Sequence, residues 1–398
     1  FDLTSAEALA DSAPVRKLLN MVLLLAIKDH ASDIHFEPFE DEFRIRIKAD
    51  GVLYEMVPPP RHLAFAITTR IKVMSNLDIA ERRMPQDGRI ELTVGGHPID
   101  LRVSVLPTMF GESVVLRILD RSVVSLDLNK VGMDAATMAL FREIIYKPNG
   151  IVLVTGPTGS GKTTTLYSIL KHINNPAMNI LTAEDPVEYE LEGVGQVQVR
   201  DDIGYTFASA LRSFLRQDPE VILVGEIRDK ETVDIALKAA LTGHLVFSTL
   251  HTNDAPSTIT RLQNMGTPNY LISAALSLIM GQRLARKTCP DCREIDESVT
   301  PQLLSAIGFT PEQTRARIYK GKGCDKCGGS GYKGRMGIYE ILEVDKQLKQ
   351  GVLSNLGQNE LVALAKKNGF RTMQNMGHDL LLGGDLTYKE YDRVLSAG

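Results

Sequence analysis

Hydrophobic and polar positions in the first part of the chain follow the spacings of helices and of half-buried strands. Residues 15–30 carry apolar side chains at helical spacing, and residues 43–48 alternate strictly between apolar and basic side chains. A second helical pattern spans residues 62–80. Three more strand-like runs follow it, at 89–94, 99–105 and 113–119. Strands with one polar face beside helices predict a small α+β domain over residues 1–120.

From residue 150 onward the pattern changes to short runs that are apolar on both faces. These runs lie at 151–154, 179–182, 221–224 and 245–249. Strands of this kind form parallel sheets covered by helices on both sides, so we expect a doubly wound α/β core over residues 134–288. Residues 121–133 lack a strong periodic element and are predicted to be the linker between the two domains.

The last part of the chain, residues 289–398, is predicted to form a C-terminal subdomain. It combines a Cys- and Gly-rich insertion at 289–340 with helical segments around 357–382 and 387–396. The whole chain has 398 residues, of which 43% are hydrophobic and 24% charged. It is therefore long enough for two or three domains with substantial cores.

The composition argues against two broad classes of protein. A net charge of −4 and a pI near 6.1 disfavour nucleic acid as the main partner, because nucleic-acid-binding domains usually carry a clear basic excess. The longest apolar run, residues 21–27, has seven residues, against about 20 for a membrane-spanning helix. The chain starts at Phe1 without an initiator Met or a signal-peptide pattern, so we expect a further N-terminal region before it.

The clearest chemical motif follows the apolar run at 151–154. It matches the P-loop pattern G-x-x-x-x-G-K-[ST] with Gly156, Pro157, Thr158, Gly159, Ser160, Gly161, Lys162 and Thr163. A helix is predicted to begin at Thr164. Thr164 is counted with the nucleotide-binding residues, because free N–H groups at a helix start favour phosphate. We expect Lys162 to reach the β- and γ-phosphates of ATP and the Thr163 hydroxyl to ligate Mg²⁺. The alternative, a glycine-rich turn without chemistry, does not explain the Lys and the Thr.

An acid follows the apolar run at 221–224. Glu226 is predicted at the carboxyl edge of the sheet, where open α/β sheets bind ligands, and is expected to hold Mg²⁺ or its water shell. Many P-loop enzymes have Asp immediately before this Glu, whereas this chain has Gly225. We therefore expect another carboxylate to help with the attacking water. The alternative is an exposed acid that caps the next helix.

That second carboxylate is predicted in the acidic segment after the run at 179–182. Glu184, Asp185 and Glu188 flank Pro186 and form a cluster that can polarise a water molecule. We assign this role first to Glu188 and leave the choice among the three acids open. A solvated acidic loop is the alternative interpretation.

Two histidines flank the run at 245–249. His251 leaves this strand at the end predicted to lie beside the nucleotide, so it could sense the γ-phosphate and transmit hydrolysis to the next element. His244 precedes the strand and is a weaker candidate for the same role. Either histidine could instead be a satisfied structural residue.

All four cysteines lie in two C-x-x-C pairs, Cys289 with Cys292 and Cys324 with Cys327. The pairs are separated by 31 residues, 293–323, and give two chelating turns that can complete a tetrahedral thiolate site for zinc. Four thiolates leave no position for water, so we expect the zinc to be structural. The absence of scattered cysteines favours a reducing compartment. Unliganded thiols or a redox pair are the alternative.

These motifs occur in the order seen in the type II/type IV secretion ATPase superfamily. The resemblance rests on residues 156–163, 184–186, 224–229 and 242–251, and also covers 32–38 and 83–89. It extends over essentially the whole chain and is strongest to the pilus assembly, or extension, branch. Retraction ATPases of the superfamily lack the tetracysteine insertion, and the Gly-rich segment 328–340 looks more like pilus assembly proteins than like type II secretion ATPases.

The resemblance implies a RecA-like P-loop core with a small PAS-like N-terminal domain and a zinc-bearing C-terminal subdomain. It also implies homohexamers, in which the N-terminal domain of one subunit packs on the core of its neighbour and contributes arginines to the nucleotide. By motif these are Arg102 and Arg117, both on predicted strands, with Arg82, Arg83 and Arg89 as weaker candidates for the same basic surface. The alternative is that these strand positions simply face water.

By the same resemblance, the protein is a cytoplasmic motor at the cytoplasmic face of the bacterial inner membrane, held there only through partners. Its hydrolysis of ATP would drive an inner-membrane platform protein that adds pilin subunits. Docking proteins of the machine would bind the further N-terminal domain. The first alternative is a type II secretion ATPase that drives pseudopilus assembly and protein export. Less favoured are a nucleic-acid translocase and a passive nucleotide-binding module.

Overall fold

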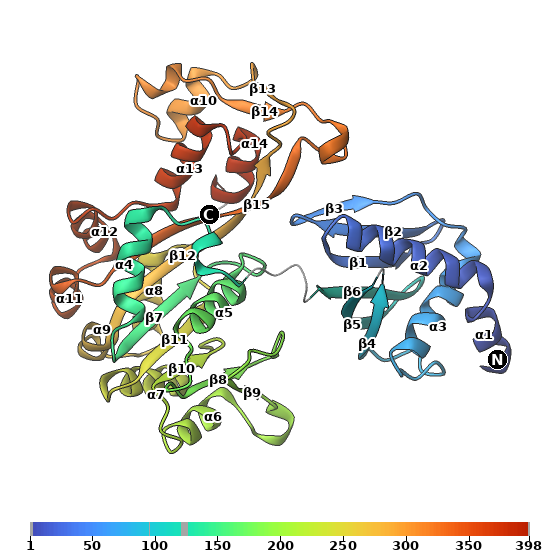
Figure 1. Ribbon diagram of the computed structural model, residues 1–398, viewed down its shortest axis with the longest axis horizontal. Helices are drawn as coiled ribbons and strands as arrows, with labels where there is room; N and C mark the ends of the chain where they lie inside the picture. Colours follow the sequence, from blue (N-terminus) through green and yellow to red (C-terminus); the bar gives the residue numbers. More distant parts are fainter. Residues whose placement is uncertain (1–2, 95, 121–125, 397–398) are drawn as a thin grey trace. The chain divides into compact units, whose positions relative to one another are not determined.

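A computed structural model describes residues 3–94, 96–120 and 126–396 of the chain (Figure 1). It divides into two compact units, Phe1–Ser125 and Leu126–Gly398. The division falls within the predicted linker, residues 121–133, of which residues 121–125 lie outside the described residues. Among the helices of the described part, none combines the length and the apolar character that a membrane span requires.

The N-terminal unit is built on a six-stranded antiparallel sheet with the strand order β3-β2-β1-β6-β5-β4. The strands are β1 (Ala31–Pro38), β2 (Phe43–Ala49), β3 (Val52–Glu55), β4 (Gln86–Val94), β5 (His97–Thr108) and β6 (Gly111–Asp120). The helices are α1 (Leu3–Ala10), α2 (Ala13–Lys28) and α3 (Ala64–Met74), with a short 3₁₀ turn at Arg61–Leu63. Because α2 packs on β1 and α3 on β6, one face of the sheet is covered and apolar.

The alternation of side chains along each strand decides which face is buried. In β2, Phe43, Ile45 and Ile47 are buried in the core of the unit, and the basic residues between them are not. At the turn that follows, Asp50 and Gly51 have φ angles of 51° and 80°, as a two-residue hairpin turn requires. The sheet therefore has an apolar face and a charged face.

The C-terminal unit is built on a seven-stranded sheet with the order β15-β12-β7-β11-β10-β8-β9. The strands are β7 (Gly150–Thr155), β8 (Ile180–Glu184), β9 (Gly195–Gln198), β10 (Val221–Val224), β11 (Leu245–Leu250), β12 (Leu276–Thr288) and β15 (Tyr332–Glu343). All neighbouring pairs are parallel except β12 and β15, which are antiparallel. The expected α/β fold is confirmed.

Helices cover both faces of this sheet (Figure 1). They are α4 (Ala135–Ile145), α5 (Lys162–Ile173), α6 (Phe207–Phe214), α7 (Lys230–Leu241), α8 (Ala255–Asn264) and α9 (Asn269–Ala275). Alternate residues of one strand enter different cores: Ile151 and Leu153 pack with the side of α7 and α8, and Val152 and Val154 with that of α5. This explains why the strands read as continuous apolar runs.

The remaining elements surround the antiparallel edge of the sheet. They are α10 (Pro301–Ala306), α11 (Lys346–Leu353), α12 (Gln358–Lys367), α13 (Met373–Gly383), α14 (Tyr388–Tyr391) and the small pair β13 (Arg293–Ile295) and β14 (Tyr319–Gly321). The boundary expected after residue 288 differs from the structure in one respect. The strand β15 comes largely from the expected insertion at 289–340, yet it pairs with β12 inside the core sheet. The cysteine-rich segment is thus an excursion between two paired strands.

Candidate nucleotide site

The loop between β7 and α5 has the geometry of a phosphate cradle. Gly156, Gly159 and Gly161 have φ angles of 153°, 79° and 87°, which glycine adopts at little cost. A Cβ on Gly156 would lie 2.4 Å from the carbonyl oxygen of Gln282 on β12, so the loop packs directly against that strand. The hydroxyl of Ser160 is buried in this loop and has no hydrogen-bond partner among the described residues. A buried unsatisfied donor fits a phosphate ligand.

The side chain of Lys162 is folded over this loop. Its Nζ donates to the carbonyl oxygens of Gly156 at 2.8 Å and Pro157 at 2.9 Å. Burial lowers the pKa of Lys162 to about 8, against an opposing effect of Glu226. Thr163 follows Lys162 in the first turn of α5 and is exposed, so its hydroxyl is accessible to a ligand. The loop thus offers a cation, a hydroxyl and N–H groups to an anion.

Glu226 and His251 meet at the carboxyl ends of neighbouring strands. Glu226 follows β10 and His251 follows β11; these two strands are neighbours, and β11 is also next to β7. The Nε2 of His251 lies 3.2 Å from an Oε of Glu226. The sheet therefore brings Lys162, Glu226 and His251 to one edge, where open α/β sheets bind ligands.

His244 lies at the opposite end of β11. Its Nδ1 is 3.0 Å from the carbonyl oxygen of Ala239 in α7, and the next residue begins the strand. A residue at the amino end of a parallel strand is remote from the carboxyl edge. His244 therefore lies away from the edge that carries Glu226 and His251.

The three acids of the acidic segment have different environments. Glu184, at the end of β8, is buried and accepts hydrogen bonds from the hydroxyls of Tyr167 and Thr182 and from the amide of Gln196. Asp185 lies 3.1 Å from Arg228. Because its oxygens are already engaged, Glu184 is suited to hold the loop and not to activate water.

Glu188 follows on the partly exposed side of this segment. Its backbone N–H donates to the hydroxyl of Tyr167 at 3.3 Å. Burial raises the pKa of Tyr189, and the charge of Glu188 beside it adds to this increase. Tyr167 and Tyr189 pack edge to face, with ring centroids 4.8 Å apart. The segment that carries Glu188 is therefore attached to α5, the helix of the P-loop, through Tyr167.

Arg228 links Glu226 to Asp185 of the acidic segment, and the sequence analysis assigned it no role. Its guanidinium forms ion pairs with Glu226 and, at 3.1 Å, with Asp185, and it stacks over the ring of Phe207 at 5.4 Å. Its pKa is raised, chiefly by the hydrogen bond with Glu226. The signal was present in the sequence as a basic residue two positions after Glu226. It neutralises carboxylates where the sequence predicts a metal site.

In the N-terminal unit, three arginines lie side by side across neighbouring strands. Arg89 on β4 is opposite Arg102 on β5, which is opposite Arg117 on β6. Arg117 is in turn opposite Asp33 on β1, and its Nε donates to an Oδ of Asp33 at 3.1 Å. Directly paired residues share a face, and the residues next to Arg102 and Arg117 on their strands are buried, so this arginine row lies on the charged face.

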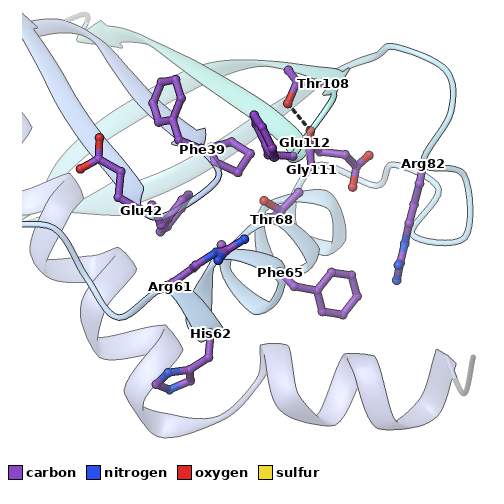
Figure 2. Close-up of a pocket in the computed structure, with 14 residues that line it drawn as sticks. Phe39, Glu42, Arg61, His62, Phe65, Thr68, Arg82, Thr108, Gly111 and Glu112 are labelled. Atoms are coloured by element: carbon purple, nitrogen blue, oxygen red, sulfur yellow. Dashed lines mark hydrogen bonds between the residues drawn. The ribbon is translucent and has the colours of Figure 1, made fainter.

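Arg82 is not part of this row. It stacks over the ring of Phe65 at 4.3 Å and lines a hollow of about 690 Å³ in the N-terminal unit (Figure 2). Glu112 at the same hollow pairs with the buried Lys72 at 2.6 Å. Arg83 is almost fully exposed and lies 3.6 Å from Glu81. The hollow and the P-loop belong to different units of the chain.

The four cysteines come together, as two C-x-x-C pairs predict. All four Sγ atoms lie within 4.8 Å of one another, with Cys289 and Cys324, and likewise Cys292 and Cys327, 3.9 Å apart. Four sulfurs bound tetrahedrally at the usual zinc–sulfur length would be roughly 3.8 Å apart. The backbone N–H of Gly323 donates to Cys292 Sγ at 3.2 Å, as N–H groups do to metal-bound thiolates. The donor set therefore fits zinc.

The chain is similar to a known protein family over nearly its whole length. Residues 8–393 match the family model described as Type II/IV secretion system protein, which is nearly the whole chain. The chain belongs to this family. The resemblance drawn from the motifs is thereby confirmed. The match runs through both units and through the tetracysteine segment.

Two relatives and one solved structure are similar to this chain over most of its length. The type IV pilus assembly ATPase PilB of Myxococcus xanthus (strain DK1622) is 52% identical over 383 residues, which are 96% of this chain and 68% of that protein. The type II secretion system protein E of Aeromonas hydrophila is 48% identical over 386 residues, 96% of this chain and 76% of that protein. The crystal structure of the pilus retraction motor PilT with bound ADP has a TM-score of 0.62 and 27% identity, and the match covers 95% of this chain and 96% of that one.

Proposed function

We propose that this protein is a motor ATPase that drives assembly of type IV pili. The observation that carries the proposal is the meeting of the P-loop, Glu226 and His251 at one edge of the sheet, with an unsatisfied Ser160 hydroxyl inside the loop. A site of this composition binds a nucleoside triphosphate. The protein hydrolyses ATP to ADP and phosphate, and the family membership supports this activity.

The proposed roles follow from the contacts of each residue. Lys162, now bonded to loop carbonyls, turns to the β- and γ-phosphates when ATP binds. The hydroxyl of Thr163 and the carboxylate of Glu226 are the oxygen ligands we assign to Mg²⁺, which supplies charge neutralisation to the phosphates when bound. His251 contacts Glu226 and so reports the state of the γ-phosphate. Arg228 must release Glu226 for this set to form.

Glu188 is assigned as the residue that orients the attacking water. The choice among the three acids is supported by their environments, since Glu184 is buried and fully bonded and Asp185 is paired with Arg228. The carboxylate of Glu188 accepts a proton from water as the oxygen attacks the γ-phosphorus and the bond to ADP breaks. The cluster is attached to the P-loop helix through Tyr167.

Six copies of the chain form a ring, and ATP is cleaved between subunits. Arg102 and Arg117 of one subunit approach the nucleotide of its neighbour and stabilise charge on the transferred phosphoryl group. Three arginines directly opposite one another on one face support this role, because together they present a basic surface to an anionic ligand. Acids within the sheet, Asp33 beside Arg117 and Asp100 beside Arg89, hold two of these side chains in place.

The two domains of each subunit close and open in turn around the ring, and this motion transmits the energy of ATP hydrolysis. The motor acts at the cytoplasmic face of the inner membrane, on a platform protein that adds pilin subunits, with docking proteins as further partners. Similarity to the pilus assembly ATPase PilB of M. xanthus supports pilus assembly. Similarity to type II secretion system protein E of A. hydrophila supports the second candidate, export driven by a pseudopilus.

The activity is tested by phosphate release from purified protein with magnesium and ATP. We expect turnover by the wild type, none by Lys162→Ala, and nucleotide binding without turnover by Glu188→Gln. Glu190→Gln is the matched control, since Glu190 is an exposed acid two residues further along. A correctly assembled wild type without turnover would contradict the ATPase, and active Glu188→Gln protein would remove the assignment of the water-orienting residue.

The cellular role is tested by deleting the gene in its host. Loss of surface pili with normal protein export supports pilus assembly, and the reverse result supports type II secretion. Stimulation of the ATPase by DNA that vanishes at moderate salt would instead favour a nucleic-acid translocase. The net charge of −4 already argues against that alternative.

A further inference from the structure

The strand β12 passes the P-loop in direct contact with it. Gly281 pairs with Thr155, the last residue of β7, so the next residues of β12 run beside the phosphate loop. On the side of α5, the Oε1 of Gln282 accepts a hydrogen bond from Thr165 Oγ1 at 2.9 Å. The side chain of Gln282 thus fixes the strand to the P-loop helix.

On its other face, β12 sends Arg283 to the loop between β11 and α8. Its Nη2 donates to the carbonyl oxygen of Asn253, and its Nη1 to that of Gln282 at 3.1 Å. Asn253 follows two residues after His251, which contacts Glu226. Arg283 therefore ties the loop that starts at His251 to the strand beside the P-loop.

Glu340 binds the same loop from the neighbouring strand β15. It lies opposite Gly281, is 3% exposed, and accepts hydrogen bonds from the backbone N–H groups of Ala255 at 2.6 Å and Met373 at 2.9 Å. These residues begin α8 and α13, and a negative charge is favoured at a helix start. A Cβ on Gly281 would lie 2.7 Å from Cγ of Glu340, so glycine makes room for the carboxylate.

These charges lie close enough to influence one another and the P-loop lysine. Burial lowers the pKa of Arg283, while the charges of Glu340 and Asp254 oppose that decrease. Arg283 also contributes, after burial, to the lowered pKa of Lys162. Arg283 is therefore near the end of the site where the triphosphate is expected.

We propose that Arg283 is a positioning residue for ATP hydrolysis, and that Arg283 and Glu340 together clamp the loop at residues 252–255. The guanidinium donates to a backbone carbonyl oxygen, and the carboxylate accepts from a backbone N–H. Each charge therefore binds a backbone group of opposite partial charge. The clamp keeps His251 beside Glu226. It also connects the nucleotide edge to α13, because Glu340 holds the first N–H of that helix.

The kinetic consequence rests on the proposed ATPase function, whereas the clamp itself does not. For Arg283→Ala we expect kcat to fall about 10-fold or more with KM for ATP changed less than about threefold, because the loop is displaced and the P-loop is intact. Arg283→Lys keeps the charge and a donor and should recover activity to within about threefold of the wild type. Lys287→Ala, an exposed position on the same strand, is the matched control.

Amide hydrogen exchange tests the clamp without any need for turnover. In Arg283→Ala the amides of residues 252–255 should exchange about tenfold faster, with that of Met373 little changed. In Glu340→Gln both Ala255 and Met373 should exchange faster, since each loses its carboxylate partner. Unchanged exchange in both variants would overturn the clamp. A raised KM with unchanged kcat would overturn the positioning role and indicate direct nucleotide binding by Arg283.

Discussion

Three glutamates of the C-terminal unit are buried and satisfied by the protein itself, whereas the sheet of the N-terminal unit carries arginines side by side on its charged face. Glu184, Glu340 and Glu390 are all nearly inaccessible, and each accepts at least two hydrogen bonds from neighbouring groups. Arg117, by contrast, is 58% exposed and stands next to another arginine. The two regions therefore use charge for different purposes.

A buried charge with all its partners in place specifies how elements fit together, and removing it leaves those partners unsatisfied. An exposed row of like charges gives little stability and opposes it slightly. The role of charges in the C-terminal core is therefore tested by the effect of their removal on stability. The charges on the open face of the N-terminal sheet are to be tested by activity.

The cysteine cluster gives the largest expected effect, because its four thiolates are satisfied only if a metal is present. We expect one zinc per chain in freshly reduced protein, measured by elemental analysis. Structural zinc in small domains contributes about 10–16 kcal/mol of apparent binding free energy, so Cys324→Ser should unfold the segment between β12 and β15. Limited proteolysis should then cleave within residues 289–331.

Asp325→Ala is the matched control for this change, because Asp325 lies between two of the cysteines without being one of the ligands. Its zinc content and protease resistance should equal those of the wild type. Reduced protein that holds no zinc and still resists cleavage would show that the cluster does not depend on a metal. The C-terminal unit would then contain an unsatisfied group of thiols, against the comparison above.

Much of the C-terminal unit could be predicted from the sequence because its signals are local. Apolar runs on both faces indicate parallel strands, and the P-loop and the C-x-x-C pairs have fixed spacings that only a few structures satisfy. Glu226 and His251 could be named as candidates because each lies within two residues of the end of such a strand. Where chemistry is attached to a strand end, sequence order alone indicates its place.

The misses share a different physical cause, which is that the decisive partner is distant in the sequence. The strand β15 was not predicted, since its half before Ile338 is polar and glycine-rich and becomes a strand only by pairing with β12. The role of Arg283 depends on Asn253, and that of Glu340 on Ala255 and Met373. Choosing among the three acids likewise required knowing that Glu184 is buried. Contacts between residues so distant in the sequence cannot be predicted from the spacing of residues along the chain.

The arginine row gives the next largest effect. For Arg117→Ala we expect kcat to fall about 10³-fold, within the range known for arginine fingers, because the transferred phosphoryl charge loses a partner. The melting temperature should change little, since the relief of repulsion among three neighbouring arginines is offset by the loss of the ion pair between Arg117 and Asp33. Phosphate release and calorimetry on the same sample measure both quantities.

Mixing Arg117→Ala protein with Lys162→Ala protein distinguishes an action between subunits from one within a chain. Hybrid rings contain sites with an intact P-loop from one variant and an intact arginine from the other, so part of the activity should return. Verified mixed assemblies without any recovery would contradict the assignment between subunits. A large loss of stability in Arg117→Ala would instead place this arginine with the structural charges of the other unit.

The smallest effect concerns Glu390, a buried charge with a structural role. Its carboxylate accepts hydrogen bonds from the backbone and side chain of Arg286 and from Arg393, and Arg286 stacks over Tyr332 at 4.0 Å. Glu390→Gln keeps the shape but removes the charge, so we expect a loss of about 2–3 kcal/mol in unfolding free energy. The kcat of the folded fraction should be unchanged, in contrast to Arg117→Ala.

The pH dependence of this loss distinguishes the charge from the shape. Burial alone would raise the pKa of Glu390, but the hydrogen bonds from Arg393 and Arg286 lower it overall. A carboxylate with a lowered folded-state pKa stabilises the protein above its unfolded-state pKa, about 4.3, and this contribution is lost as the pH falls through the folded-state value. Denaturation of the two proteins at neutral pH and at successively lower pH should therefore show the wild type losing its advantage over Glu390→Gln only in the acidic range. An advantage that stays constant down to the lowest pH would mean that Glu390 acts through packing, and its charge would then not be what holds α14 to β12.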